Sequence, residues 1–103
     1  MTKLVLTSFA KKTQAVAFAK KLISDKLAAC AMTLPGATSV FRWKGKAQTT
    51  TEALLLIKTS HLRLGALEKF FKRQHPYELP QYLVLSPTAS KKFGAWIENE
   101  VKS

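Results

Sequence analysis

The fold is decided by residues 28–59, AACAMTLPGATSVFRWKGKAQTTTEALLLIKT. The first half has a strand-like pattern and ends at Lys44-Gly45, a pair typical of a tight turn. The second half runs from three threonines, which favour strands, into LLLI at residues 54–57. That apolar run is expected of a strand covered on both faces. The two halves therefore predict one long hairpin, with a bend or bulge at Pro35-Gly36.

The length of this hairpin has a consequence for its surroundings. Straight arms of roughly 15 residues would reach ~50 Å, whereas a globule of this chain length is only ~33 Å across. The hairpin must therefore bend or project. A projecting tip would expose Val40, Phe41 and Trp43, and pairing with another copy would cover them. The pattern leaves open the alternative that these side chains fold back onto the chain's own helices.

The flanking segments predict three helices and two further strands. Residues 3–7 are expected to form a strand, and residues 11–26 an amphipathic helix capped by Ser8 or Thr13. Ser60 is the expected cap of a second helix, which Pro76 ends. Residues 81–86 are a fourth strand. A third helix is expected to begin at Thr88 or Ser90, with a buried stripe of Phe93, Trp96, Ile97 and Val101.

The resulting order, β-α-β-β-α-β-α, predicts one α+β domain over residues 1–103. Two βαβ units separated by a hairpin give the ferredoxin-like arrangement, in which an antiparallel sheet carries helices on one face. A chain of this length buries enough surface for an ordinary core. The single cysteine, Cys30, cannot form an internal disulfide, and no export signal is evident, so we expect a reducing, cytoplasmic setting. No apolar run approaches the ~20 residues that cross a bilayer.

The chain is strongly basic, with 17 Lys and Arg against 6 Asp and Glu, a net charge of +11. Such a charge attracts polyanions in a salt-dependent way. The lysines are scattered, however, which is more typical of a solvated surface. No helix-turn-helix, zinc-finger or aromatic RNA-binding signature is present, so nucleic acid is not favoured as a partner. A polyanion or nucleotide binder stays open as an alternative function.

The candidate site is the stretch HPYELP at residues 75–80, between the second helix and the fourth strand. The two prolines hold the residues before them in extended geometry. A histidine, a phenol and a carboxylate, His75, Tyr77 and Glu78, are thereby crowded on a stiff tether. They could bind protons or a metal ion, or His75 could merely end the helix while Tyr77 packs.

Five motifs together resemble the CutA-type divalent-cation tolerance proteins. They are KLAACA at 26–31, LPGATS at 34–39, FRWKG at 41–45, LLIKT at 55–59 and HPYELP at 75–80. The resemblance implies a ferredoxin-like subunit in a homotrimer whose long hairpins pair between subunits. It also implies a bacterial cytoplasmic setting and a role in tolerance to copper and other divalent metals, without enzymatic activity. A regulatory role like that of the PII signalling proteins is the alternative.

The family's described copper ligands are a cysteine in the first strand and a pair of histidines. The matching positions here hold Thr7, Gln74 and His75, and the first two are poor ligands. A set of His75, Glu78 and Cys30 would suit Zn or Cu if folding or trimerisation brought the three together.

Further matches place Trp43, Lys58 and Tyr77 in the cleft between subunits, where a small anionic ligand is another possibility. The family's usual acidic positions hold Lys11, Lys12 and residues 48–51 instead, which weighs against simple cation buffering. A third class is an enzyme with Cys30 as nucleophile and His75 as base. The sequence around Cys30, Ala-Ala-Cys-Ala, is more typical of a small buried side chain than of a reactive thiol.

Overall fold

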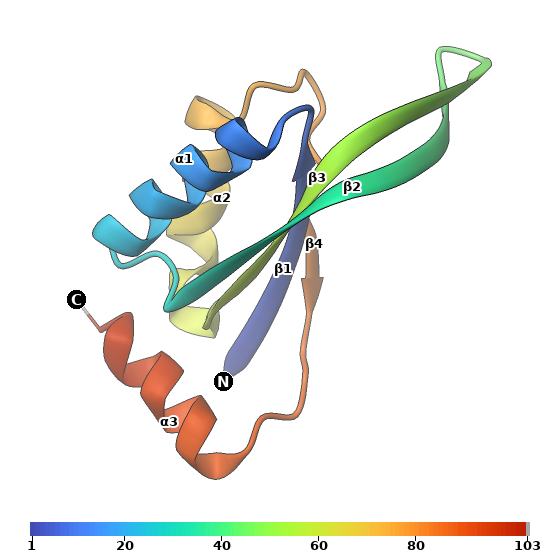
Figure 1. The fold of residues 1–103 in the computed structure, drawn as a ribbon. Coiled ribbons are helices and arrows are strands. Elements are labelled where there is room, and N and C mark those ends of the chain that lie inside the picture. The colour runs from blue at the N-terminus through green and yellow to red at the C-terminus, as the bar shows by residue number, and fades with distance from the viewer. Residues whose placement is uncertain (103) are drawn as a thin grey trace.

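The computed structural model describes residues 1–102 and has the predicted order of elements. The strands are β1 (Thr2–Phe9), β2 (Cys30–Trp43), β3 (Lys46–Ser60) and β4 (Leu83–Leu85). The helices are α1 (Lys12–Ser24), α2 (Leu64–Gln74), preceded by the 3-10 helix η1 (His61–Arg63), and α3 (Lys91–Glu100). The strands form one antiparallel sheet in the order β2-β3-β1-β4 (Figure 1). The predicted ferredoxin-like α+β fold is confirmed.

The long hairpin of β2 and β3 projects from the rest of the subunit. Figure 1 shows its tip extending away from the helices, and the subunit is 43 Å long but only 26 and 22 Å in its other two dimensions. Val40 is 72% exposed, and Phe41 and Trp43 are also exposed. The alternative that these residues fold back onto the helices is therefore wrong.

Two local conformations shape the hairpin, and both were expected from the sequence. Lys44 and Gly45 have φ angles of 50° and 80°, the positive values that a two-residue type I′ turn requires. The register shifts between Leu34 and Ala37, where Gly36 has a φ of 78°. The predicted bulge at Pro35-Gly36 is confirmed, because glycine adopts this backbone conformation without strain.

The core lies between one face of the sheet and the helices α1 and α2. Val5, Leu55 and Ile57 project from the central strands and are fully buried, as are Leu22 of α1 and Leu67 of α2. Phe18 makes edge contacts with Phe70 and Phe71, with ring centroids 5.1 Å apart in both pairs. None of the helices within residues 1–102 has the length and apolar character needed to cross a membrane.

The other face of the sheet is apolar, and within residues 1–102 neither α1 nor α2 lies over it (Figure 1). Apolar residues lie opposite each other across neighbouring strands on this face. The pairs are Leu34 with Leu54, Met32 with Leu56, and Leu6 with Leu83. Met32 and Leu34 are each 46% exposed, and Leu83 is 53% exposed. We call this surface the open face. The expectation that residues 54–57 are covered on both sides is wrong for the single subunit, because Leu54 and Leu56 are only half-buried.

The helix caps agree with the sequence at two of three positions. The Ser60 side chain accepts a hydrogen bond from the Leu62 N–H at 3.4 Å, and that of Ser90 accepts from the Phe93 N–H at 3.3 Å. Ser8 and Thr13 do not cap α1. The cap position is Lys11, whose N–H donates to the Gln14 side chain at 3.2 Å.

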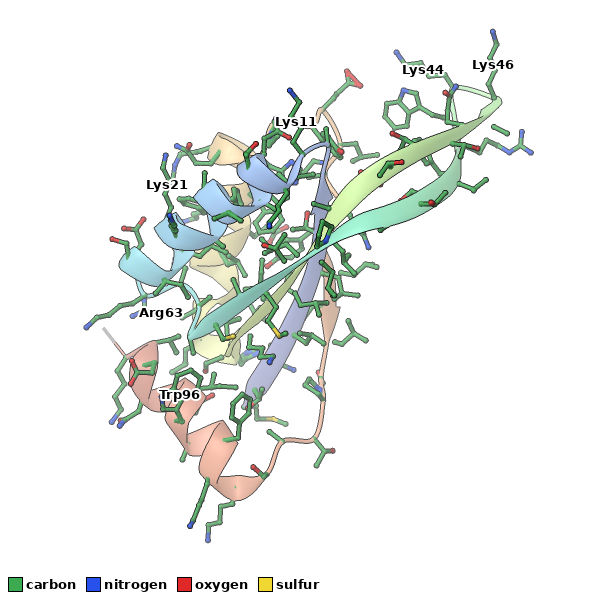
Figure 2. All side chains as sticks on the ribbon, viewed as in Figure 1. Lys11, Lys21, Lys44, Lys46, Arg63 and Trp96 are labelled. Carbon is green, nitrogen blue, oxygen red and sulfur yellow. The ribbon has the colours of Figure 1, made fainter. Side chains whose placement is uncertain are left out.

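The third helix buries only half of its expected stripe. Ile97 and Val101 are buried, whereas Phe93 and Trp96 are 42% and 43% exposed and stack on each other with centroids 5.6 Å apart. Figure 2 shows Trp96 on α3, away from α1 and α2. The helical period gives the correct face of α3, but the single subunit has too little sheet to cover both aromatic rings.

Candidate functional site

The HPYELP stretch begins where α2 ends and lies against the carboxyl end of β1. His75 caps the helix, with an extended backbone (φ −74°, ψ 133°) and its N–H donating to the Phe71 carbonyl at 3.0 Å. Pro76 disfavours the helical conformation at the residue before it, which explains why α2 stops here. The histidine side chain turns inward, and only 9% of the residue is exposed.

Both ring nitrogens of His75 are hydrogen-bonded. Nδ1 accepts the N–H of Tyr77 at 3.1 Å, so the proton of the neutral ring is on Nε2. Nε2 donates to the Ser8 carbonyl at 3.0 Å and lies 3.2 Å from the Thr7 hydroxyl. The ring also stacks on Phe9, with centroids 4.3 Å apart. Neither nitrogen has a lone pair free for a metal ion.

The environment of His75 favours its neutral form. Burial lowers the pKa of the imidazole, and this effect outweighs the hydrogen bond to the Ser8 carbonyl and the nearby Glu52 carboxylate, both of which raise it. The aromatic rings around it supply an apolar surrounding in which a charged imidazolium would lose its hydration. His75 is therefore a core histidine that joins β1 to the loop after α2.

Glu52 of β3 is a residue of the candidate site that the sequence did not indicate. Its Oε2 accepts hydrogen bonds from the Tyr77 hydroxyl at 2.7 Å and the Ser8 hydroxyl at 3.0 Å. Burial alone would raise the pKa of this carboxyl, but hydrogen bonds from the hydroxyls of Ser39, Tyr77 and Ser8 together lower it. Burial and the Glu52 carboxylate raise the pKa of Tyr77, so the phenol stays protonated and donates.

A groove opens beside this network, between the HPYELP loop and the long hairpin, along which its lining extends from Glu52 to Trp43 near the tip. Its volume is about 970 Å³, within the range of small-molecule sites. It is lined by fourteen residues, among them Phe41, Trp43, Glu52, Tyr77 and Glu78. The groove therefore combines aromatic surface with two carboxylates.

The residues singled out from the sequence fall at two separate places. Trp43, Tyr77 and Glu78 line the groove. Cys30 and Lys58 lie opposite each other on β2 and β3, on the open face. The Lys58 ammonium there approaches the Met32 sulfur at 3.5 Å and lies 5.4 Å from the centre of the Phe93 ring.

The expected metal set of His75, Glu78 and Cys30 is not assembled within one subunit. His75 packs among aromatic rings on the helix-covered side of the sheet, whereas Cys30 is on the open face. Among residues 1–102 no three His, Cys, Asp or Glu side chains are grouped so that they could hold a metal ion. The same separation leaves Cys30 without His75 as a base, so the arrangement does not form the nucleophile–base pair of the enzyme hypothesis.

The fold and site define a class of small ferredoxin-like proteins with a projecting hairpin and a groove beside it. Residues 3–100 match the family described as CutA1 divalent ion tolerance protein. The chain belongs to this family, as the five motifs had indicated. The family description refers to ion tolerance, not to a catalysed reaction.

Individual relatives support this membership. The chain is 40% identical over 85 residues to protein CutA 1, chloroplastic, of Oryza sativa, covering 82% of this chain and 48% of the relative. It is 40% identical over 84 residues to the divalent-cation tolerance protein CutA of Citrobacter koseri, covering 82% of this chain and 73% of the relative. The structure of CutA from Xylella fastidiosa superposes with a TM-score of 0.93 at 32% identity, covering 98% of each chain.

The relatives differ in length and in compartment. The match spans about half the length of the plant relatives and about three quarters of the bacterial one. The plant names specify the chloroplast. Family membership alone therefore does not fix the cytoplasmic setting that was expected from the sequence.

Proposed function

We propose that this protein is a non-enzymatic homotrimer that acts in the cytoplasm in tolerance of divalent metal ions, copper among them. The observation that supports the assembly is the open face, where leucines and a methionine that belong to the sheet are left about half exposed. Contiguous apolar surface of this kind is typical of association sites. The edge strands β2 and β4 also have backbone groups available for pairing with another copy.

The proposed metal contact has to involve more than one subunit. Thiolate, carboxylate and imidazole are suitable ligands for Cu or Zn. Within the subunit, however, Cys30 and Glu78 lie at separate places, and His75 uses both ring nitrogens in hydrogen bonds. We therefore expect any site that uses these residues, or Trp43, Lys58 and Tyr77 around it, to form only where subunits meet.

The assembly is tested by light scattering of the purified chain at low micromolar concentration. We expect a trimer for the wild type and smaller species for Leu34→Lys, which places a charge on the open face. Leu62→Lys is the matched control, because Leu62 is 85% exposed on η1 and lies outside the open face. A monomeric wild type, or equal effects of the two variants, would contradict the proposed assembly.

The metal contact is tested by calorimetric titration of Cu(II), and separately Zn(II), into the same protein. Saturable binding that weakens in Cys30→Ser or Glu78→Gln, with the oligomeric state unchanged, would support the proposed ligands. Replacing His75 is a poor test because its ring packs in the core. If no saturable binding occurs, the protein would have to act in metal tolerance without holding the ion.

A further inference from the structure

The basic residues that are scattered along the sequence are gathered by the fold on its helix side. Residues 11–26 and 61–74, which hold α1, η1 and α2, contain nine Lys or Arg and two acidic residues, whereas the rest of the chain contains eight and four. Figure 1 places α1 and α2 on one side of the sheet, and Figure 2 shows Lys11 and Lys21 at the outside of α1. We call the outward surface of α1, η1 and α2 the helix face.

The positive charges of the helix face are not neutralised within the subunit. Among residues 1–102 the one ion pair joins the amino group of Met1 to Glu98, so none of the nine is in an ion pair. Arg63 alone is held by the backbone, through a 2.7 Å hydrogen bond from Nε to the Val101 carbonyl. The helix face therefore presents a positive field to its surroundings.

The helix face stays accessible if the subunits associate as proposed above. It lies on the opposite side of the sheet from the open face, so association through the open face does not cover it. The large exposed aromatic side chains belong to the hairpin and α3 instead: Phe41, Trp43, Phe93 and Trp96. The helix face thus lacks the aromatic residues that favour membrane insertion or the stacking of nucleic-acid bases.

A small hollow lies in the helix face between α1 and the end of α2, and we call it the notch. Its volume is about 230 Å³, which accommodates a side chain rather than a drug-sized molecule, since sites for the latter are typically roughly 300–1,000 Å³. Phe18 and Pro76 give it apolar surface, Gln14 and Gln74 contribute amide groups, and Lys21 contributes a charge. None of the described residues that line it is acidic.

Further cations flank the notch, because α1 begins where α2 ends. The lining takes residues from the first turn of α1 and from the last turn of α2. Lys11 and Lys12 lie at that start of α1, and Lys72 and Arg73 lie in that last turn of α2. The nearby acidic residue Glu78 lines the groove beside the hairpin, not the notch. The notch is therefore a hollow with amide groups inside and lysines around it.

We propose that the helix face docks an acidic peptide segment of a partner protein, with a carboxylate at Lys21 and the peptide backbone at Gln14 and Gln74. Amide side chains both donate and accept, which matches peptide groups, whereas a phosphate backbone only accepts. Gln14 Oε1 already accepts the Lys11 N–H at 3.2 Å, so its amide NH₂ is left to donate to a peptide carbonyl. The proposal does not depend on metal tolerance, and its failure would leave the oligomer and metal experiments above unaffected.

The test measures the fluorescence anisotropy of a labelled peptide on addition of the full chain, at about 0.15 M ionic strength. The probe is fluorescein-labelled GEELEELG, and labelled GQQLQQLG is the neutral control. We expect saturable binding of the acidic peptide that weakens as salt is added, and no binding of the neutral one. A labelled DNA duplex of about 12 base pairs and sedimented vesicles with about 30% phosphatidylserine represent the other anionic partners.

One pair of variants separates the helix face from net charge. The first variant replaces three exposed lysines at the notch together: Lys12→Gln, Lys21→Gln and Lys72→Gln. The control replaces three exposed lysines of α3 and the residues after it: Lys91→Gln, Lys92→Gln and Lys102→Gln. The first should weaken the acidic peptide about tenfold, since each exposed charge pair contributes modestly. The control should change it by less than about twofold.

A second pair separates the notch from the rest of the helix face. Ala17→Glu places a carboxylate in the notch, whereas Ala66→Glu places one on α2 outside its lining. Both replace exposed alanines within helices, so the net charge changes equally. Binding of the acidic peptide should be lost in Ala17→Glu and stay close to wild type in Ala66→Glu. If circular dichroism finds Ala17→Glu misfolded, Gln74→Glu takes its place, because Gln74 is exposed at the end of α2.

Four results would overturn the proposal. Equal weakening by the two triple variants would reduce the effect to net charge. Equal weakening by Ala17→Glu and Ala66→Glu would remove the notch from the interaction. Tighter binding of the duplex or the vesicles, with the same dependence on Ala17→Glu, would assign the notch to a phosphate group. The absence of saturation with the acidic peptide would show that the helix face is an ordinary solvated surface.

Discussion

Replacing His75 with alanine should destabilise the fold rather than remove a surface ligand. The change removes the hydrogen bonds of both ring nitrogens, at 3.0 Å to the Ser8 carbonyl and 3.1 Å from the Tyr77 N–H. It also removes the stacking on Phe9. Leaving a buried polar group without a partner costs about 1–3 kcal/mol, which applies in full to the Ser8 carbonyl and less to the part-buried Tyr77 N–H. Since the structure can relax and admit water, we expect a total loss of about 3–5 kcal/mol, as for other aromatic-to-alanine changes in cores.

The assay is urea unfolding followed by circular dichroism, at a fixed protein concentration because the proposed association would contribute to stability. His61→Ala is the control, since His61 is the only other histidine and is exposed on η1. That variant should stay within about 0.5 kcal/mol of the wild type. A His75→Ala protein as stable as His61→Ala would refute the assignment of His75 as a core residue and revive it as a candidate ligand.

Two further predictions concern pH and the hairpin turn. Because the pKa of His75 in the folded protein lies below the 6.5 of an unperturbed histidine, its stabilising contribution is present above pH 6.5 and is lost as the pH falls through the folded-state value. Urea midpoints from pH 8 to 5 should therefore decrease in wild type and His61→Ala alike, and a flat profile would contradict the burial effect. Gly45→Ala should destabilise by about 1 kcal/mol because its φ is +80°. Gly65→Ala, in α2 with open space around its Cα, should instead stabilise by up to about 1 kcal/mol, and thermal melts that give both changes the same sign would refute this.

The sequence was sufficient for the fold because its signals are local. The turn at Lys44-Gly45, the bulge at Pro35-Gly36 and the caps at Ser60 and Ser90 each depend on a few neighbouring residues. The predicted cap of α1 was wrong because Ser8 lies within β1, before the actual cap position at Lys11, and its hydroxyl bonds to Glu52. A propensity cannot anticipate such a competing partner 44 residues away.

The site was only partly predictable, because register and partners decide it. The HPYELP loop could be recognised, but Glu52 is one acidic residue at the end of a threonine run. Only the pairing of β1 with β3 brings it to Ser8 and Tyr77. The alternation of side chains along β3 could have indicated that Glu52 shares a face with Leu54. It could not have indicated that Ser8 and Tyr77 are its hydrogen-bond partners. Likewise, the helical period gave the face of α3 on which Phe93 and Trp96 lie, but not that both would be left exposed.

The strand order affects how the chain can fold during its synthesis. β1 is made first, but its hydrogen-bonding partners are β3 and β4, and Phe9 pairs with Ala53. At synthesis rates of about 5–20 residues per second, roughly 2–9 seconds separate the synthesis of Phe9 from that of its partner Ala53. The strands β2 and β3, by contrast, are joined by a two-residue turn at Lys44-Gly45, and β-hairpins form in microseconds. Because β1 lies between β3 and β4 in the sheet, its pairing can be completed only after both of these later strands have been made.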